Sequence, residues 1–226
     1  MLLHVPAALN QSQVMECRRA LAQADWVDGR RTAPGPLANI KHNREISGTN
    51  PVAWKLGEMI FGALSSNVIL VTRALPIRFT PALFSCYEGG ETYGTHVDEG
   101  IMQMPAPNVP LRADLSATLF ISSPEDYDGG ELTIEDMFGE QTVKLPAGDM
   151  IVYPASSLHR VQPVTRGKRL VSFFWFQSAI RSDEARMLLT LLNAGIERFL
   201  QVAPNDKGVM DLLGVYNNLL RMWSEN

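Results

Sequence analysis

The feature that most constrains the fold is a series of short apolar segments, separated by turn residues, between Asn67 and Gln177. About seven segments follow one another at the spacing of β-strands joined by tight connections. They read NVILVTR, IRFTPALFSCY, ADLSATLFIS, GELTIED, QTVKL, DMIVYP and RLVSFFWFQS. This pattern predicts an antiparallel sandwich or barrel.

Helical patterns precede the β region. Asn10 or Ser12 is placed to cap a helix that runs through Leu21, and Asn50-Pro51 is the N-cap and first-turn pair of a helix that runs toward Leu64. The first of these helices has one apolar face, made of Val14, Cys17 and Leu21. We therefore expect a mixed, mainly helical region ahead of the strands.

Helical periodicity returns after Ser178. Ser182 followed by Asp183-Glu184 predicts the start of one helix, and a second is predicted from Val209 to Trp223. The apolar residues of the first are Met187, Leu188, Leu191, Leu192, Ile196 and Phe199. Because the strand Leu170 to Phe176 is apolar on both faces, we expect these helices to cover one side of the β core.

Composition excludes several classes of protein. With 226 residues, 46% of them hydrophobic, the chain can form one large domain with a substantial core. A net charge of -4, with scattered Lys and Arg, provides no basic surface for nucleic acid. There is no run of 18 apolar residues and no leader of signal type, so we expect no membrane span and a cytoplasmic location. Cys17 and Cys86 form no CxxC motif and are expected to be buried, reduced thiols.

A candidate metal site begins in SCYEGGETYGTHVDEG, where Asp98 follows His96 by two residues. Alternate residues of an extended segment point to the same side, so both side chains can reach one ion. His159 comes at the end of another short strand, just after a turn. Two histidines and a carboxylate form the facial triad of non-haem Fe(II) oxygenases, whereas a structural zinc site needs a fourth protein ligand.

Arg169 opens the most apolar strand, ten residues after His159. A guanidinium that projects into an apolar pocket is costly unless an anion meets it, and its planar fork matches a carboxylate. A dicarboxylate co-substrate such as 2-oxoglutarate would supply that anion while its other end chelates the metal.

These residues together resemble a known family. The order is Tyr87-x-x-Gly90-x-x-Tyr93-x-x-His96-x-Asp98, then Gly129-Gly130-Glu131-Leu132, then His159 and Arg169. It resembles the prolyl 4-hydroxylase branch of the Fe(II)/2-oxoglutarate dioxygenases and, more closely, the bacterial PKHD-type (PiuC-like) hydroxylases. The motifs cover residues 78–178, and the flanking helices also suit that family.

The resemblance implies an α+β protein with a double-stranded β-helix, or jelly roll. It assigns the iron to His96, Asp98 and His159, 2-oxoglutarate to Arg169, and the reduction of iron to ascorbate. It also implies that Tyr87 binds the co-substrate, although Tyr93 competes for that role. The implied division is an amino-terminal support region (1–77), a dioxygenase core (78–178) and a carboxy-terminal helical extension (179–226), in which the leucine-rich helices are either core or a contact in a homo-oligomer.

Other polar residues have simpler interpretations. His4 and His42 are interpreted as packed or solvated histidines, and Arg166 and Lys168 as solvated turn residues. The stretch 125–128 is interpreted as a hairpin loop, because it lacks the ligand pattern of an EF-hand. The two glycine pairs, Gly89-Gly90 and Gly129-Gly130, are expected in turns and bulges.

The segment Ile101 to Arg112, IMQMPAPNVPLR, follows the aspartate directly. It is interpreted either as a lid that gates the substrate or as an irregular crossover that packs its apolar residues.

Three functions agree with these residues. The leading one is an oxygenase that uses Fe(II), O2 and 2-oxoglutarate to hydroxylate a protein side chain, a peptide or a small molecule, with release of succinate and CO2. The second is a non-catalytic sensor of iron or 2-oxoglutarate on the same fold. The third is a cupin-like metalloenzyme such as an isomerase, in which Arg169 has no clear task. Nothing in the sequence identifies the substrate.

Overall fold

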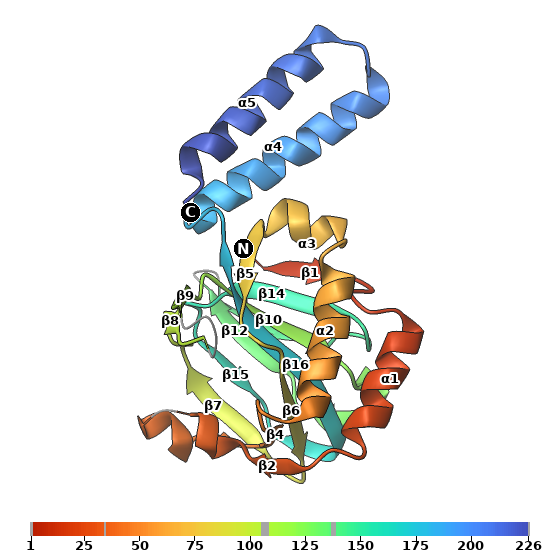
Figure 1. Cartoon of the computed structure of the whole chain (residues 1–226), viewed down its shortest axis with the longest axis vertical. Helices are drawn as coiled ribbons and strands as arrows, with labels where there is room; N and C mark the ends of the chain where they lie inside the picture. Colours follow the sequence, from red (N-terminus) through yellow and green to blue (C-terminus); the bar gives the residue numbers. More distant parts are fainter. Residues whose placement is uncertain (1, 34, 105–108, 137–138, 226) are drawn as a thin grey trace.

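A computed structural model of the chain describes residues 2–33, 35–104, 109–136 and 139–225. Its centre is a pair of antiparallel sheets that face each other (Figure 1). The path through the larger sheet is β1 (Leu3–Val5), β14 (Met150–Pro154), β10 (Leu115–Phe120), β16 (Val164–Ser178), β6 (Leu83–Glu88), β4 (Arg44–Ile46) and β2 (Trp26–Asp28). At the two ends of β16, β11 (Tyr127–Gly129) and β5 (Pro76–Phe79) also pair with it.

The smaller sheet carries much of the candidate site. Its order is β13 (Gly139–Val143), β12 (Leu132–Asp136), β15 (His159–Val161), β7 (Thr92–His96) and β3 (Lys41–His42). A separate hairpin is formed by β8 (Ile101–Met102) and β9 (Leu111–Arg112), and three short 3-10 helices lie at 29–32, 35–39 and 124–126. The expected jelly roll is confirmed.

The amino-terminal helices begin and end where their caps predict. In α1 (Gln11–Leu21), the Asn10 side chain accepts the N–H of Gln13 and the Gln13 side chain accepts the N–H of Asn10, which completes a capping box. In α2 (Pro51–Leu64), Asn50 is the N-cap. The buried faces of both helices pack on the larger sheet, against apolar side chains of β10 and two phenylalanines of β16. These helices, rather than the carboxy-terminal pair, cover the β core (Figure 1).

One predicted strand is wrong. The segment NVILVTR forms α3 (Val68–Arg73), in which the Asn67 side chain accepts the N–H of Leu70 and caps the helix. In a short apolar run, periodicity cannot distinguish a strand from a buried helical turn. The cap at Asn67 favours the helix. In addition, the predicted strand IRFTPALFSCY is divided into β5 and β6.

The carboxy-terminal helices form a hairpin that projects from the β body (Figure 1). Ser182 caps α4 (Asp183–Val202) as predicted, and α5 (Lys207–Trp223) follows. Of the predicted apolar residues, Ile196 is buried, whereas Met187, Leu188 and Leu191 are exposed. The expectation that this pair covers the β core is therefore wrong. Within the described part of the chain, no helix has the length and apolarity needed to cross a membrane.

Candidate active site

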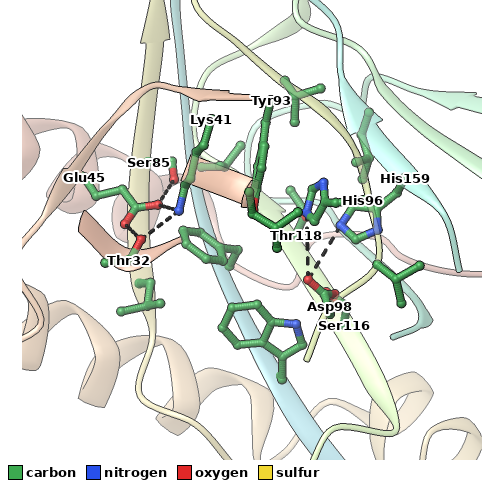
Figure 2. A pocket seen from close by; sticks show the side chains of 18 of the residues that line it. Thr32, Lys41, Glu45, Ser85, Tyr93, His96, Asp98, Ser116, Thr118 and His159 are labelled. Carbon is green, nitrogen blue, oxygen red and sulfur yellow. Dashed lines mark hydrogen bonds and ion pairs between the residues drawn. The ribbon is translucent and has the colours of Figure 1, made fainter. Parts of the chain in front are cut away.

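The structure brings together the three predicted metal ligands. His96 is the last residue of β7 and His159 the first of β15, and the two are paired across the smaller sheet. Asp98 lies just beyond β7, with its Oδ1 atom 4.0 Å from His96 Nε2 and 3.7 Å from His159 Nε2 (Figure 2). One ligand atom from each residue lies within 4.8 Å of the others, so a single ion can contact all three.

Backbone carbonyls orient both imidazoles. His96 Nδ1 lies 2.8 Å from the carbonyl oxygen of Gly94, and His159 Nδ1 lies 3.0 Å from that of Ser157. A proton on each Nδ1 leaves each Nε2 as a lone-pair donor facing Asp98, which is the usual support for metal-binding histidines. The Oδ2 atom of Asp98 is buried without a hydrogen-bond partner. This donor set fits Fe(II).

The surroundings keep His96 neutral. Burial, followed by the proximity of His159, lowers the pKa of His96 below its ordinary value. Tyr93 stacks on the His96 ring with centroids 3.7 Å apart, and Tyr153 contacts His159 edge to face at 5.1 Å. Neutral imidazole is the form that binds a metal.

The three ligands line a cavity of about 200 Å³ between the two sheets. Its wall combines polar and aromatic side chains from both sheets (Figure 2). They include Thr32, Lys41, Glu45, Ser85, Tyr87, Tyr93, Ser116, Thr118, Tyr153, Arg169, Phe173 and Trp175. The cavity therefore has space for organic ligands beside the metal ligands.

Arg169 reaches this cavity from β16 and is 1% exposed. Its guanidinium lies 5.3 Å from the centre of the Tyr87 ring and 5.5 Å from that of Phe120. In the described residues no carboxylate forms an ion pair with it, and its Nε atom is buried without a partner. The hydroxyl of Tyr127 is buried and unpartnered as well. A buried guanidinium in this state can bind an anion.

Gly130, which the sequence placed only in a turn or bulge, allows Arg169 and Tyr127 to pack in this way. Its φ is +67°, and an added Cβ would lie 2.7 Å from Val164 Cγ2 and 3.0 Å from both Arg169 Cδ and a Tyr127 ring carbon. Gly129 lies at a β-bulge, as predicted. Gly130 therefore does more than turn the chain, because it lets Val164, Arg169 and Tyr127 pack closely around it.

The residues interpreted as packed or solvated lie outside the cluster of metal ligands. His4 contacts Asp149 at 2.7 Å, and neither His4 nor His42 belongs to a metal-ligand cluster of the described residues. Arg166 and Lys168 are exposed as expected, but both lie in β16 rather than in a turn, so that part of the prediction is wrong. In the acidic stretch, Asp126 pairs with Arg18 and Asp128 with Arg166. The two cysteines are buried and free, as predicted.

The proposed lid is described only in part. Its ends form the β8–β9 hairpin, and Met102 lines the cavity. Residues 105–108 lie outside the described residues. The gating role therefore stays a prediction.

Sequence reasoning missed Lys41, Glu45 and Tyr153. Lys41 and Glu45 belong to strands of two and three residues, too short for any periodicity to mark. Tyr153 lies in the predicted strand DMIVYP, but only the fold shows that its ring faces the cavity.

Comparison with known proteins identifies the family. Residues 82–177 match the 2OG-Fe(II) oxygenase superfamily, and residues 183–225 match the PKHD-type hydroxylase C-terminal domain. A PKHD-type hydroxylase of Herminiimonas arsenicoxydans is 49% identical over 223 residues, which is 99% of each chain. The chain belongs to the PKHD-type hydroxylases. It is accordingly an Fe(II)- and 2-oxoglutarate-dependent oxygenase, and as a PKHD-type hydroxylase it uses O2 and an organic substrate.

Solved structures agree on the fold of this PKHD-type hydroxylase. A prolyl-4-hydroxylase of Pseudomonas putida is 22% identical, with a TM-score of 0.50 over 78% of this chain and 92% of that one. A prolyl hydroxylase of Trichoplax adhaerens is 16% identical, with a TM-score of 0.55 over 83% of this chain and 86% of that one. These likenesses concern the jelly roll alone.

Proposed function

We propose that this chain hydroxylates its substrate at a centre where His96, Asp98 and His159 hold Fe(II) and Arg169 binds 2-oxoglutarate. One observation carries the proposal: a cluster of three metal donors and a buried guanidinium without a counter-ion line the same cavity. The C5 carboxylate of 2-oxoglutarate supplies the anion that Arg169 lacks, in a bidentate pairing that suits its planar fork.

The chain's own residues prepare the site. When bound, Fe(II) and 2-oxoglutarate activate O2 to oxidise a C–H bond of the substrate, with release of succinate and CO2. The carbonyls of Gly94 and Ser157 hold each imidazole with Nε2 toward Asp98. Tyr93 and Tyr153 pack on the imidazole rings and limit the access of water to them.

We assign co-substrate binding to Tyr87 rather than to Tyr93. Tyr87 is the cross-strand partner of Arg169, and its ring lies under the guanidinium. Tyr93 instead stacks on His96. Support for Tyr87 thus comes from its place beside the residue that binds the carboxylate.

Further parts of the proposal rest on the resemblance and on composition. They are the reduction of iron by ascorbate, a cytoplasmic location, no nucleic-acid partner, and the division into 1–77, 78–178 and 179–226. A homo-oligomer through α4 and α5 is proposed because apolar side chains of both helices are exposed, among them Leu188, Leu191, Met210 and Met222.

The test is succinate formation by the iron-loaded chain, supplied with 2-oxoglutarate, O2 and cell extract. Succinate that appears only when all components are present, with one oxygen atom from 18O2 in a product, supports the hydroxylase. Asp98→Ala should abolish iron binding, and Arg166→Ala, at an exposed ion pair, is the matched control. Tight binding of 2-oxoglutarate without any succinate would instead favour the sensor.

A further inference from the structure

A buried ion pair forms another part of the cavity wall. Lys41 Nζ lies 2.6 Å from Glu45 Oε1 and 2.7 Å from Thr32 Oγ1 (Figure 2). Lys41 is 5% exposed and Glu45 2%. The pair bridges the two sheets, because Lys41 belongs to β3 of the smaller sheet and Glu45 to β4 of the larger.

Stability alone does not account for this pair. Taking two charges out of water costs several kcal/mol, and well-packed apolar residues often hold a fold as firmly as a buried ion pair. Both side chains line the cavity that contains the metal ligands. A role toward a ligand therefore explains their place better than a role in joining the sheets.

The pair has unused hydrogen-bonding capacity. An ammonium has three N–H donors, of which Thr32 and Glu45 accept two, and the described residues offer no partner for the third. The Glu45 carboxylate accepts hydrogen bonds from Thr32 and Ser85 and has further lone-pair sites. The cavity wall thus presents one donor beside one acceptor, with no net charge.

Aromatic rings connect this pair to the metal ligands. Lys41 Nζ lies 5.2 Å from the centre of the Tyr93 ring and 6.0 Å from that of Phe173. The Tyr93 ring also stacks on His96, and Trp175 packs edge to face on Phe173. The pair and a metal ligand therefore contact the same aromatic ring in the wall of one cavity.

We propose that Lys41 and Glu45 bind an amide-bearing part of the hydroxylation substrate, with Lys41 donating to a carbonyl oxygen and Glu45 accepting from an N–H that points to the same side, as the C=O and N–H of one residue do in an extended chain. An anionic group would be repelled by Glu45 and a cationic group by Lys41, whereas a neutral amide satisfies both. Apolar groups beside that amide contact Phe173 and Trp175. This inference rests on the proposed function, and the amide comes from a polypeptide or from a small molecule.

The test compares three probes on the full chain loaded with Fe(II) and 2-oxoglutarate without oxygen. They are N-acetylleucine N′-methylamide, which is neutral, N-acetylleucine, an anion, and leucine N-methylamide, a cation. Equilibrium dialysis should show the neutral probe binding about tenfold tighter than either charged one. Binding no tighter than that of the charged probes would overturn the proposal, and this comparison needs no variant.

Glu45→Gln sharpens the test by leaving Lys41 as an uncompensated cation. The variant should reverse the order of binding, so that N-acetylleucine becomes the tightest probe, whereas Arg166→Met, at an exposed pair, should keep the original order. If the order of the three probe affinities is unchanged in Glu45→Gln, the proposal is contradicted. A pair with a purely structural role would not determine which probe charge the chain prefers.

Two further arms complete the design. Dialysis of 2-oxoglutarate on the same samples separates the two proposals: a chain that does not bind it refutes the proposed function, whereas normal 2-oxoglutarate binding without probe preference refutes only the amide site. Capped peptides of two to four residues distinguish the sources. Affinity that rises with length identifies a polypeptide substrate, and constant affinity identifies a small molecule.

Discussion

Two cations line one cavity, and they differ in their partners. Arg169 is buried between Tyr87 and Phe120 without a carboxylate among the described residues, whereas Lys41 is buried against Glu45. A buried cation without a counter-ion raises the free energy of the folded state until an anion binds it. A buried cation that is already paired carries a smaller cost and can still accept a neutral ligand. From this difference we propose a carboxylate as the ligand of Arg169 and an uncharged polar group as the ligand of Lys41.

The largest expected effect concerns stability at the paired end. Lys41→Met leaves Glu45 buried without its counter-ion and should lower the free energy of unfolding by about 3–5 kcal/mol, measured with denaturant. The double variant Lys41→Met/Glu45→Met should recover most of this loss, because it removes both charges. A double variant as unstable as the single one would show that the fold itself needs the pair.

At the unpaired end the main effect is on binding. Arg169→Met should weaken 2-oxoglutarate binding by roughly 30- to 3,000-fold, since it removes the charged partner of a buried carboxylate. Iron binding and the free energy of unfolding should be maintained, because the variant removes an uncompensated cation. Calorimetric titration of 2-oxoglutarate and of Fe(II) measures both affinities, denaturant unfolding measures the stability, and normal affinity for the keto acid would remove Arg169 from the site.

Gly130 tests whether the packing of Arg169 matters. Gly130→Ala should weaken 2-oxoglutarate binding by about tenfold, because its Cβ would displace Val164, Arg169 and Tyr127 at a cost of order 1–3 kcal/mol. Gly89→Ala is the matched control, since Gly89 also has a positive φ but nothing within 4 Å of an added Cβ. Equal losses of affinity in both variants would mean that backbone strain, not the pocket, is responsible.

The smallest effect is expected at Tyr127. Its buried hydroxyl has no partner, so Tyr127→Phe should leave the midpoint of thermal unfolding unchanged or slightly raised. If that hydroxyl donates to the bound carboxylate, 2-oxoglutarate affinity should fall by about two- to tenfold, the usual contribution of one hydrogen bond. Unchanged affinity would restrict the anion site to Arg169 and its aromatic neighbours.

Local rules predicted some parts of the molecule and not others. The caps at Asn10, Asn50 and Ser182 place helix starts correctly, because capping depends on neighbouring residues. Asn67 is also an N-cap, and because the prediction did not use it, the residues of α3 were predicted as a strand. Apolar periodicity also failed in α4, because it shows that a helix has an apolar side without showing what covers that side.

The candidate site divides in the same way. The spacing of His96 and Asp98, and a cation just before a run of apolar residues, can be read from residue types alone, so these residues were predicted although β16 begins at Val164 rather than at Arg169. Whether that cation has a counter-ion depends on strands far apart in the chain.

The sequence by itself determined the types of group available: two histidines and an aspartate that can hold a metal, and an arginine that can pair with a dicarboxylate, in strands of a jelly roll. Only the tertiary structure decided that Arg169 lies unpaired and that Lys41 and Glu45 face the same cavity from different sheets. The physical reason is that donor types follow from residue identity and local spacing, whereas burial and charge pairing arise from contacts that only the packed sheets create.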